Sequence, residues 1–259
     1  MSKTTALVTG ASNGIGKAIA EKFAQEGYDL VIVARNLPQL QNLARDWQQQ
    51  YKVKVTAIAA DLSVAGGAQE VYAQVKQANL RISHLVNNAG YGLFGLFAES
   101  DLADEVAMLQ LNMLSLTVLT KLFLPDVLSQ RGRIMNLAST AAFQPGPYMA
   151  AYFASKAYVL SFSEALAEEL SDQGVSVTAF CPGPTTSGFQ DKAAMQNSGF
   201  VKGKTLPSAE EIGVLGYQAM MAGKRVYIPG VMNWLGAQAV RFCPRAFTTW
   251  LVKKMSLPV

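Results

Sequence analysis

The residues with the clearest chemical potential are Tyr152 and Lys156, four positions apart, with Ser139 thirteen residues upstream of the tyrosine. On a helix, side chains four positions apart share one face, so this spacing brings a phenol and an ammonium together. An ammonium held ~4 Å from a phenol oxygen favours the phenolate by ~4 kcal/mol at an effective dielectric of about 20. The pair therefore predicts a tyrosine whose pKa is low enough to exchange a proton with an alcohol at ordinary pH. Because Tyr-x-x-x-Lys also occurs by chance, the hypothesis depends on the rest of the chain.

The composition favours a single large α/β protein. The chain has 259 residues, of which 50% are hydrophobic and 15% charged, and this suits a domain with buried parallel strands. The net charge is only +4, which argues against a nucleic-acid partner. Residues 231–259 contain four basic and no acidic residues, so this tail carries all of that excess. The sequence has only two cysteines and no recognisable signal peptide, so we expect a cytoplasmic protein. It has no uninterrupted apolar run of about 18 residues, so we expect no membrane-spanning helix.

Apolar runs that alternate with helical periodicity predict the fold. Such alternation implies a doubly wound parallel sheet of about seven strands, a Rossmann-type three-layer α/β/α arrangement. The expected strands are 5–9, 30–34, 53–59, 82–86, 133–137, 175–180 and 226–228, and the expected helices begin after Gly14 and cover 37–51, 67–79, 101–128 and 150–171. We expect one dinucleotide-binding and catalytic domain over 1–230. Residues 231–259 are expected to form a helical extension, divided by Pro244, that packs on the domain or on a partner.

A glycine-rich turn joins the first expected strand to the first helix. Gly10, Gly14 and Gly16 let the backbone approach a pyrophosphate closely, and the helix N-terminus presents N–H donors to it. The turn therefore predicts dinucleotide binding. Arg35 follows the second strand, where an acidic residue would select NAD(H). Because a guanidinium can hold a 2′-phosphate with two hydrogen bonds, the sequence favours NADP(H) over NAD(H).

With the glycine turn, Asn87-Asn88-Ala89-Gly90, Ser139 and the Tyr152/Lys156 pair in this order, the sequence resembles the short-chain dehydrogenase/reductase family, in its single-domain branch. The resemblance covers about residues 4–230 and leaves the tail outside it. It implies that Ser139 binds the substrate oxygen, that Tyr152 is the acid/base, and that Lys156 lowers the tyrosine pKa and holds the nicotinamide ribose. It further implies that Asn112 anchors a water in a proton relay.

The same resemblance implies a set of cofactor-binding residues around the catalytic group. Asp61 and Leu62 would contact adenine, Asn88, Ala89 and Gly90 would flank a cofactor ribose, Pro182 and Gly183 would face the nicotinamide, and Thr185 and Ser187 would lie near its carboxamide. Asn13 stands where many NADP-dependent relatives carry a basic residue, so the NADP prediction depends on Arg35. The complete cofactor set is Gly10, Ser12, Asn13, Gly14, Ile15, Gly16, Arg35, Asp61, Leu62, Asn88, Ala89, Gly90, Tyr152, Lys156, Pro182, Gly183, Thr185 and Ser187.

Two irregular segments, 91–98 and 182–206, follow expected strands and together with 145–149 would form the substrate pocket. The proposed pocket residues are apolar and aromatic: Leu93, Phe94, Tyr148, Met149 and Phe189. We therefore expect an NADPH-dependent reductase that converts an apolar ketone reversibly to a secondary alcohol. One alternative is a 3-oxoacyl thioester reductase of lipid metabolism, and another is a non-catalytic NADP(H)-sensing protein.

Other potential sites receive structural interpretations. The single His84 lies inside an expected strand and Cys181 has no histidine near it in sequence, so neither is expected to act in chemistry, and no metal site is expected. The family resemblance makes a homo-dimer or homo-tetramer the expected state. The tail has tryptophans, phenylalanines and basic residues, a pattern that fits either contact with a membrane surface or cover for an apolar patch on the domain or on a neighbouring subunit. We favour the second interpretation.

Overall fold

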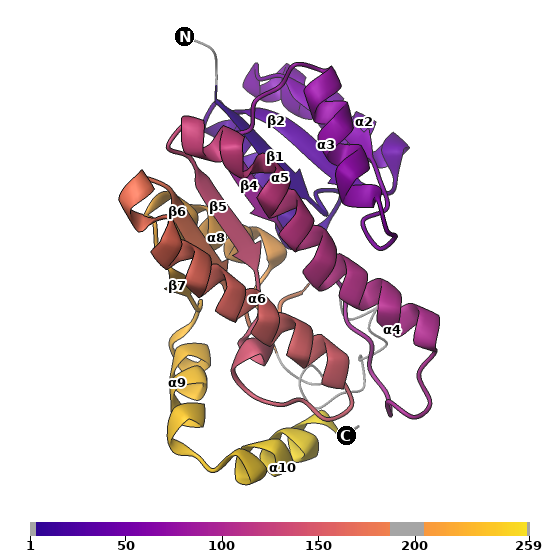
Figure 1. The fold of residues 1–259 in the computed structure, drawn as a ribbon, viewed down its shortest axis with the longest axis vertical. Helices are drawn as coiled ribbons and strands as arrows, with labels where there is room; N and C mark the ends of the chain where they lie inside the picture. The colour runs from indigo at the N-terminus through magenta and orange to yellow at the C-terminus, as the bar shows by residue number, and fades with distance from the viewer. Residues whose placement is uncertain (1–3, 187–204, 258–259) are drawn as a thin grey trace.

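The computed structural model describes residues 4–186 and 205–257 and contains one parallel seven-stranded sheet in the order β3-β2-β1-β4-β5-β6-β7 (Figure 1). The strands are β1 (Thr5–Thr9), β2 (Asp29–Ala34), β3 (Val55–Ala59), β4 (His84–Asn87), β5 (Arg133–Leu137), β6 (Ser176–Phe180) and β7 (Val226–Tyr227). Val8 of β1 pairs with Ile32 of β2 on one side and Val86 of β4 on the other. The expected doubly wound fold is thereby confirmed.

Helices cover both faces of the sheet, as Figure 1 shows. They are α1 (Gly14–Gln25), α2 (Leu37–Tyr51), α3 (Gly67–Gln77), α4 (Leu102–Leu109), α5 (Leu116–Ser129), α6 (Ala150–Glu169), α8 (Ala209–Met221), α9 (Val231–Ala239) and α10 (Arg245–Ser256). Short 3₁₀ turns occupy Thr140–Phe143, Ser171–Gln173 and Val240–Phe242. The element order matches the sequence expectation, and most ends differ from it by one or two residues.

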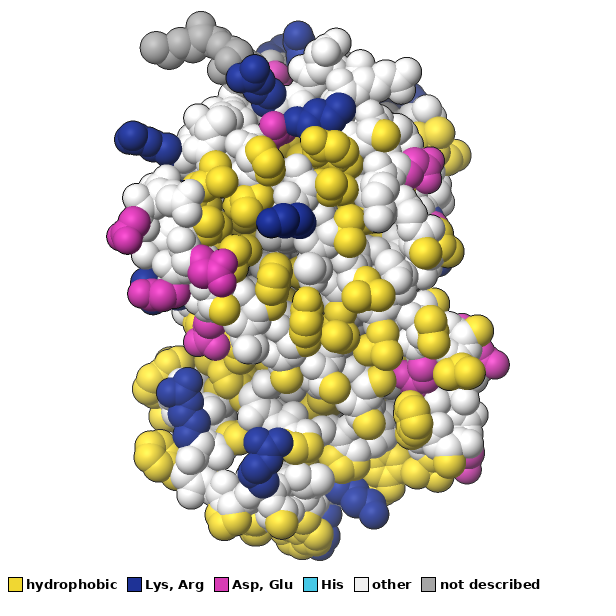
Figure 2. Space-filling view, in the orientation of Figure 1, with side chains coloured by type: hydrophobic (Ala, Val, Ile, Leu, Met, Phe, Trp, Pro, Cys, Tyr) yellow, Lys and Arg dark blue, Asp and Glu magenta, His cyan; other side chains and the backbone are white. Residues whose placement is uncertain are grey.

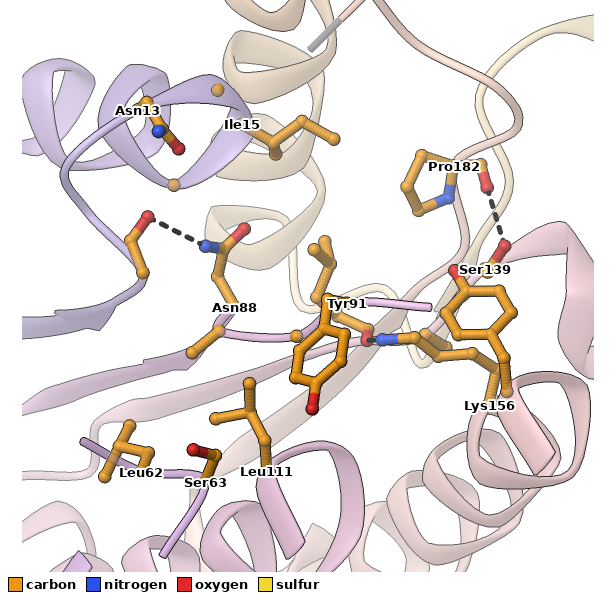
Figure 3. Close-up of a pocket in the computed structure, with 18 of the residues that line it drawn as sticks. Asn13, Ile15, Leu62, Ser63, Asn88, Tyr91, Leu111, Ser139, Lys156 and Pro182 are labelled. Carbon is orange, nitrogen blue, oxygen red and sulfur yellow. Dashed lines mark hydrogen bonds between the residues drawn. The ribbon is translucent and has the colours of Figure 1, made fainter. Parts of the chain in front are cut away.

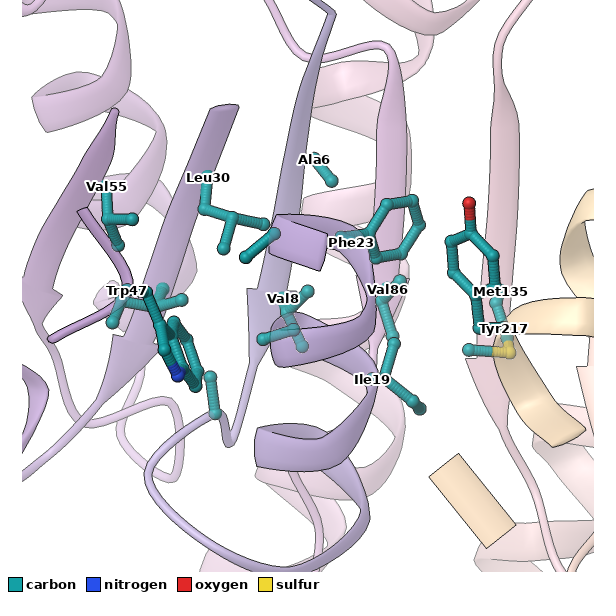
Figure 4. Packing of buried hydrophobic residues seen from close by; sticks show 14 of the residues in the cluster. Ala6, Val8, Ile19, Phe23, Leu30, Trp47, Val55, Val86, Met135 and Tyr217 are labelled. Atoms are coloured by element: carbon teal, nitrogen blue, oxygen red, sulfur yellow. The ribbon is translucent and has the colours of Figure 1, made fainter. Parts of the chain in front are cut away.

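The core has two layers because successive strand residues point to opposite faces. Ala6 and Val8 pack with α1, α2 and α8, where Phe23 and Trp47 are fully or almost fully buried (Figure 4). Leu7 and its neighbours on the other face pack with α3, α5 and α6. The strand order reverses between β1 and β4, which opens a crevice at the carboxyl ends of the strands. The glycine turn after β1 and the residues that follow β4 therefore lie at this crevice.

The expected continuous helix over 101–128 is instead three segments. A π-helical stretch, Gln110–Ser115, separates α4 from α5. Periodicity in the sequence could not show this widened stretch, because it changes the winding of the helix without interrupting its apolar character. The helical region 102–129 is long and apolar enough to cross a membrane, and an 18-residue window within it has a mean hydropathy of 1.5. Leu119, Phe123 and Val127 are nevertheless buried in the core, so this helix has the packing of a domain helix.

The tail helices pack on the domain through a narrow inner stripe. In α10, Thr248, Val252 and Ser256 are buried at four-residue spacing, and in α9 only Ala237 is fully buried. The two tryptophans lie on the outer side, with Trp234 50% and Trp250 49% exposed. The tryptophan-bearing face therefore does not make the contact with the domain, and its expected contact with a neighbouring subunit stays a prediction.

Candidate active site

A cavity of about 750 Å³ lies at the carboxyl end of the sheet and brings most of the expected site residues together (Figure 3). Its lining includes Gly10, Ser12, Asn13, Gly14, Ile15, Gly16, Arg35, Asp61, Leu62, Asn88, Ala89, Gly90, Leu93, Ser139, Met149, Tyr152, Lys156, Pro182, Gly183 and Thr185. These residues follow the carboxyl ends of strands β1 to β6 or lie in the first turn of α1 and the first two turns of α6. Ser187 and Phe189 lie outside the described residues.

The glycine turn is locked to the end of β4 by Asn88. The Asn88 side-chain amide donates hydrogen bonds to the carbonyls of Thr9 at 2.8 Å and Gly10 at 3.3 Å. A Cβ atom on Gly16 would lie 2.2 Å from the Asn88 Nδ2 and 2.4 Å from the Gly10 carbonyl oxygen. Gly10 itself has a φ of +66°, in the left-handed region. Gly10 and Gly16 therefore make room for the Asn88 side chain, and this contact fixes the position of the glycine turn at the cavity.

The N-terminus of α1 faces the cavity with its first amides unmatched by a side-chain cap. Asn13 is the N-cap residue, but its side chain makes no capping hydrogen bond, and the first turn contains no acidic residue. N–H groups at such an end, together with the helix dipole, attract an anion. Residues 12–16 also line the cavity, so this end of it fits a pyrophosphate group.

Arg35 and Asp61 mark the outer end of the cavity. Arg35 is exposed just beyond β2. Burial acts to raise the pKa of Asp61, but hydrogen bonds from the Ser63 hydroxyl and amide, at 2.5 and 2.9 Å, and the positive charge of Arg35 outweigh it, so the pKa is lowered. The Asp61 carboxylate is thus held ionised close to the Arg35 guanidinium. Ser63, which also lines the cavity, is a neighbour that no sequence motif singled out.

Ser139 and Tyr152 meet at the inner end. Ser139 follows β5 and caps the 3₁₀ turn Thr140–Phe143, where its hydroxyl accepts from the Ala141 amide at 3.1 Å. The same hydroxyl contacts the carbonyl of Pro182 at 3.4 Å and forms a hydrogen bond with the phenol of Tyr152. A carbonyl oxygen placed between these two hydroxyls would meet two hydrogen-bond donors.

Lys156 lies one helical turn after Tyr152, as predicted, but its ammonium is hydrogen-bonded to a backbone carbonyl. The Nζ atom donates to the carbonyl of Leu137 at 2.7 Å and lies 5.8 Å from the centre of the Tyr152 ring. Burial raises the pKa of Tyr152 to about 12, although the hydrogen bond with Ser139 opposes this, and burial lowers the pKa of Lys156 to about 8. The expectation of a tyrosine pKa lowered by the lysine is therefore wrong for the protein's own side chains, because the desolvation of both groups dominates.

Asn112 connects α6 to the turn after β4. It is buried in the π-helical stretch, where its side-chain oxygen accepts from the Tyr91 amide at 3.2 Å. Its side-chain nitrogen donates to the Tyr91 carbonyl at 2.9 Å and to the Ser155 hydroxyl at 3.1 Å. Ser155 in turn donates to the Tyr152 carbonyl at 2.7 Å. Asn112 thus positions α6, while its role in a water relay stays a prediction.

The expected substrate residues divide between two adjoining cavities. Leu93 and Met149 line the large one, whereas Phe94 and Tyr148, whose rings stack with centroids 6.0 Å apart, line a neighbouring cavity of about 230 Å³. The two cavities share Leu93, Met149 and Tyr152. Sequence reasoning missed Phe153 in the large cavity, and it missed Val252 of α10, which packs in the same buried cluster as Met149, Tyr152 and Phe153.

His84 and Cys181 play structural parts. His84 accepts or donates a 2.8 Å hydrogen bond with Ser83 and packs against the rings of Phe23 and Tyr28. Burial raises the pKa of the Cys181 thiol to about 12, which keeps it protonated and a poor nucleophile. Among residues 4–186 and 205–257, no group of three His, Cys, Asp or Glu side chains could hold a metal ion.

Comparison with known proteins places these features in a family context. The sequence profile of the family described as short chain dehydrogenase matches residues 4–198. A solved short-chain dehydrogenase from Sphingobium yanoikuyae in complex with NADPH has a TM-score of 0.82 and 31% identity, with 92% of this chain and 94% of that chain covered. The bulky-bulky ketone specific alcohol dehydrogenase from Comamonas testosteroni has a TM-score of 0.79 and 29% identity, with 93% of each chain covered.

The human very-long-chain 3-oxoacyl-CoA reductase is 33% identical over 184 residues, which cover 68% of this chain and 58% of that protein. The chain spans little more than half the length of this relative and of several others.

Proposed function

The chain belongs to the short-chain dehydrogenase family, and from this membership we propose that it is an NADPH-dependent reductase that converts an apolar ketone to a secondary alcohol. The observation that carries the proposal is one continuous cavity with two chemically different ends. At one end an uncapped helix N-terminus and Arg35 suit the phosphates of a dinucleotide. At the other end Ser139, Tyr152 and Lys156 converge.

The residues that would hold the cofactor fit its parts in order along the cavity. The amides of the glycine turn and of the first turn of α1 would bind the pyrophosphate, and Arg35 would bind the 2′-phosphate. Asn88, Ala89 and Gly90 would lie beside a ribose, and Pro182 and Gly183 beside the nicotinamide. When bound, NADPH would supply the hydride that reduces the carbonyl carbon.

The protein itself would supply the proton. The hydroxyls of Ser139 and Tyr152 would both donate to the carbonyl oxygen, which gathers negative charge as the hydride arrives. A tyrosine whose pKa is raised by burial remains protonated at neutral pH, so it retains the proton that the alkoxide must receive. The resulting phenolate would then be stabilised by the Ser139 hydroxyl and by the nearby Lys156 ammonium.

The apolar lining supports a bulky ketone as substrate. Leu93, Met149 and Phe153 surround the catalytic tyrosine, and the second cavity extends the apolar volume past Phe94 and Tyr148. A ketone with two large substituents could place one in each cavity. The named substrate class of the Comamonas testosteroni relative is consistent with this assignment.

A 3-oxoacyl thioester is the second candidate substrate, favoured by the named activity of the 3-oxoacyl-CoA reductase relatives. A 3-oxoacyl-CoA carries a long polar coenzyme A group, which would have to extend out of the cavity, whereas a bulky ketone has no such group. A panel that contains bulky aryl ketones, a 3-oxoacyl-CoA and its short N-acetylcysteamine thioester would separate the two. Turnover of the aryl ketones alone favours the first candidate, and preference for the CoA thioester favours the second.

NADPH oxidation at 340 nm with this panel is the direct test of catalysis. The Tyr152→Phe variant should still bind NADPH, as measured by its fluorescence, but should lose about 10²–10⁴-fold in kcat because only the proton donor is removed. A wild-type protein that binds NADPH without turning over any ketone would favour the non-catalytic alternative. Retained turnover in the variant would remove Tyr152 from its proposed role.

Homo-oligomerisation and cytoplasmic location stay predictions.

A further inference from the structure

We propose that the outer face of the tail helices α9 and α10 docks on an anionic lipid bilayer. The proposal goes beyond the reductase activity and does not depend on it, because vesicle binding is measured without turnover. We define the docking face by six exposed apolar side chains and the four cations of the tail: Met232, Trp234, Phe242, Phe247, Trp250 and Leu251, with Arg241, Arg245, Lys253 and Lys254.

The apolar part of the docking face is exposed although the helices already contact the domain. Phe242 is 87% exposed, Met232 79% and Phe247 51%, and both tryptophans are about half exposed. Figure 2 shows hydrophobic side chains and several Lys and Arg side chains together at the end of the molecule that α9 and α10 form in Figure 1. Amphipathic helices with tryptophan and phenylalanine on one side and cations beside them bind at the boundary between headgroups and acyl chains.

The charges select the lipid. Arg241, Arg245, Lys253 and Lys254 lie in the tail, and residues 231–257 contain no Asp or Glu. The Lys254 ammonium lies 4.5 Å from the centre of the Trp250 ring, and Phe247 stacks on Trp250 with ring centroids 5.8 Å apart. A cation held beside aromatic rings is placed where it meets a lipid phosphate while the rings enter the interface.

The same charges argue against a second copy of the chain as the occupant. In a two-fold symmetric dimer each surface patch meets its own copy. Here that would bring four cations from each subunit together without any acidic side chain from residues 231–257 to balance them. An anionic bilayer instead supplies the opposite charge over the whole docking face.

Docking would place the substrate cavity close to the lipid. Val252, on the inner side of α10, belongs to the buried cluster that contains Met149 and Tyr152, while Trp250 and Leu251 on the same helix face outward. Because a helix with its side chains is only about 10–12 Å across, the catalytic end of the cavity lies roughly one helix diameter from the docking face.

Co-sedimentation of the full chain with vesicles tests the proposal. Vesicles of phosphatidylcholine alone are compared with vesicles of equal parts phosphatidylcholine and phosphatidylglycerol at 0.1 M salt. We expect binding to the anionic vesicles and at least roughly tenfold weaker binding to the neutral ones, and we expect higher salt to weaken it. The double variants Phe247→Ser/Trp250→Ser and Arg245→Glu/Lys254→Glu should each lose at least about tenfold in partitioning.

Matched control variants separate the docking face from general surface properties. Leu102→Ser/Val106→Ser removes two exposed apolar side chains from α4, and Arg45→Glu/Lys54→Glu reverses two exposed cations near α2 and β3. Both controls should bind as the wild type does, and circular dichroism should show that every variant is folded. Equal losses in the controls and the tail variants would overturn the proposal.

Tryptophan fluorescence gives a second readout. Trp47 is buried in the domain core, so a blue shift on adding anionic vesicles would report Trp234 and Trp250. Brominated lipids should quench this emission. A wild-type protein that does not bind anionic vesicles would overturn the proposal. If that protein is instead a dimer that the Phe247→Ser/Trp250→Ser variant dissociates, a second copy of the chain covers the docking face.

Discussion

Gly16 and Asn88 approach each other so closely that no side chain fits between them. A Cβ atom on Gly16 would lie 2.2 Å from the Asn88 Nδ2 and 2.4 Å from the carbonyl oxygen of Gly10. The Asn88 amide occupies this space because it joins the ends of β1 and β4 through the Thr9 carbonyl. The cofactor end of the cavity therefore depends on a contact between two strands and one helix.

We expect Gly16→Ala to destabilise the fold by about 1–3 kcal/mol, since backbone and a fixed amide must both move. NADPH affinity should fall with it. Gly236→Ala is the matched control, because a Cβ there meets nothing within 4 Å in the exposed part of α9. Urea unfolding measures the free energy of each variant, and a Gly16→Ala protein as stable as the Gly236→Ala protein would contradict the prediction.

Arg35→Asp should reverse the cofactor preference. The new carboxylate would repel a 2′-phosphate and accept hydrogen bonds from the ribose hydroxyls of NADH. We expect kcat/KM for NADPH to fall at least about tenfold while that for NADH is maintained or rises. Arg45→Asp, an exposed position on α2 outside the cavity, is the charge-matched control. An unchanged ratio of NADPH to NADH in the Arg35 variant would remove this residue from the phosphate site.

The pH dependence of reduction should follow Lys156 before Tyr152. Burial lowers the pKa of Lys156 to about 8 and raises that of Tyr152 to about 12, so the lysine loses its charge first as the pH rises. We expect kcat/KM for reduction to decline above about pH 8. The affinity of the Tyr152→Phe variant for NADPH, measured by fluorescence, should weaken over the same pH range, because this variant keeps Lys156 and lacks the tyrosine hydroxyl. A profile that stays flat to pH 9.5 would contradict the assignment.

His84 should make the fold sensitive to acid. Burial, with the positive charge of Arg133, lowers the pKa of His84 from 6.5 to about 4. Between these values the unfolded chain binds a proton that the native chain does not, so the free energy of unfolding decreases as the pH falls. The expected loss is about 2–3 kcal/mol between pH 6.5 and pH 4. Urea titrations at several pH values should show a smaller loss in His84→Phe, since this is the chain's single histidine.

Sequence alone predicted the sheet well because each buried strand is an apolar run between glycine or polar turns. The cofactor end of the cavity was also predictable, since its chemistry comes from backbone amides at a glycine turn and does not depend on side-chain directions. Arg35, Asp61 and Asn88 lie where the motif order suggested.

Other features depend on three-dimensional packing that periodicity does not encode. The distance between Tyr152 and Lys156 along the helix was predictable, but the lysine's hydrogen bond to the Leu137 carbonyl comes from the neighbouring strand. Amphipathicity revealed an apolar face on the tail helices, yet a smaller stripe through Val252 makes the contact with the domain. The buried cluster around Tyr152 therefore includes Val252, from a segment 100 residues further along the chain.

The π-helical stretch Gln110–Ser115 has a consequence for how this catalytic arrangement could be lost. A π-helical stretch holds about one residue more per turn than an α-helix does, so the removal of one residue would close the stretch into α-helix and change the direction in which Asn112 projects. Asn112 could then no longer face both Tyr91 and Ser155. A single-codon deletion could therefore leave Ser139, Tyr152, Lys156 and the glycine turn in place and still remove the contact by which Asn112 holds α6.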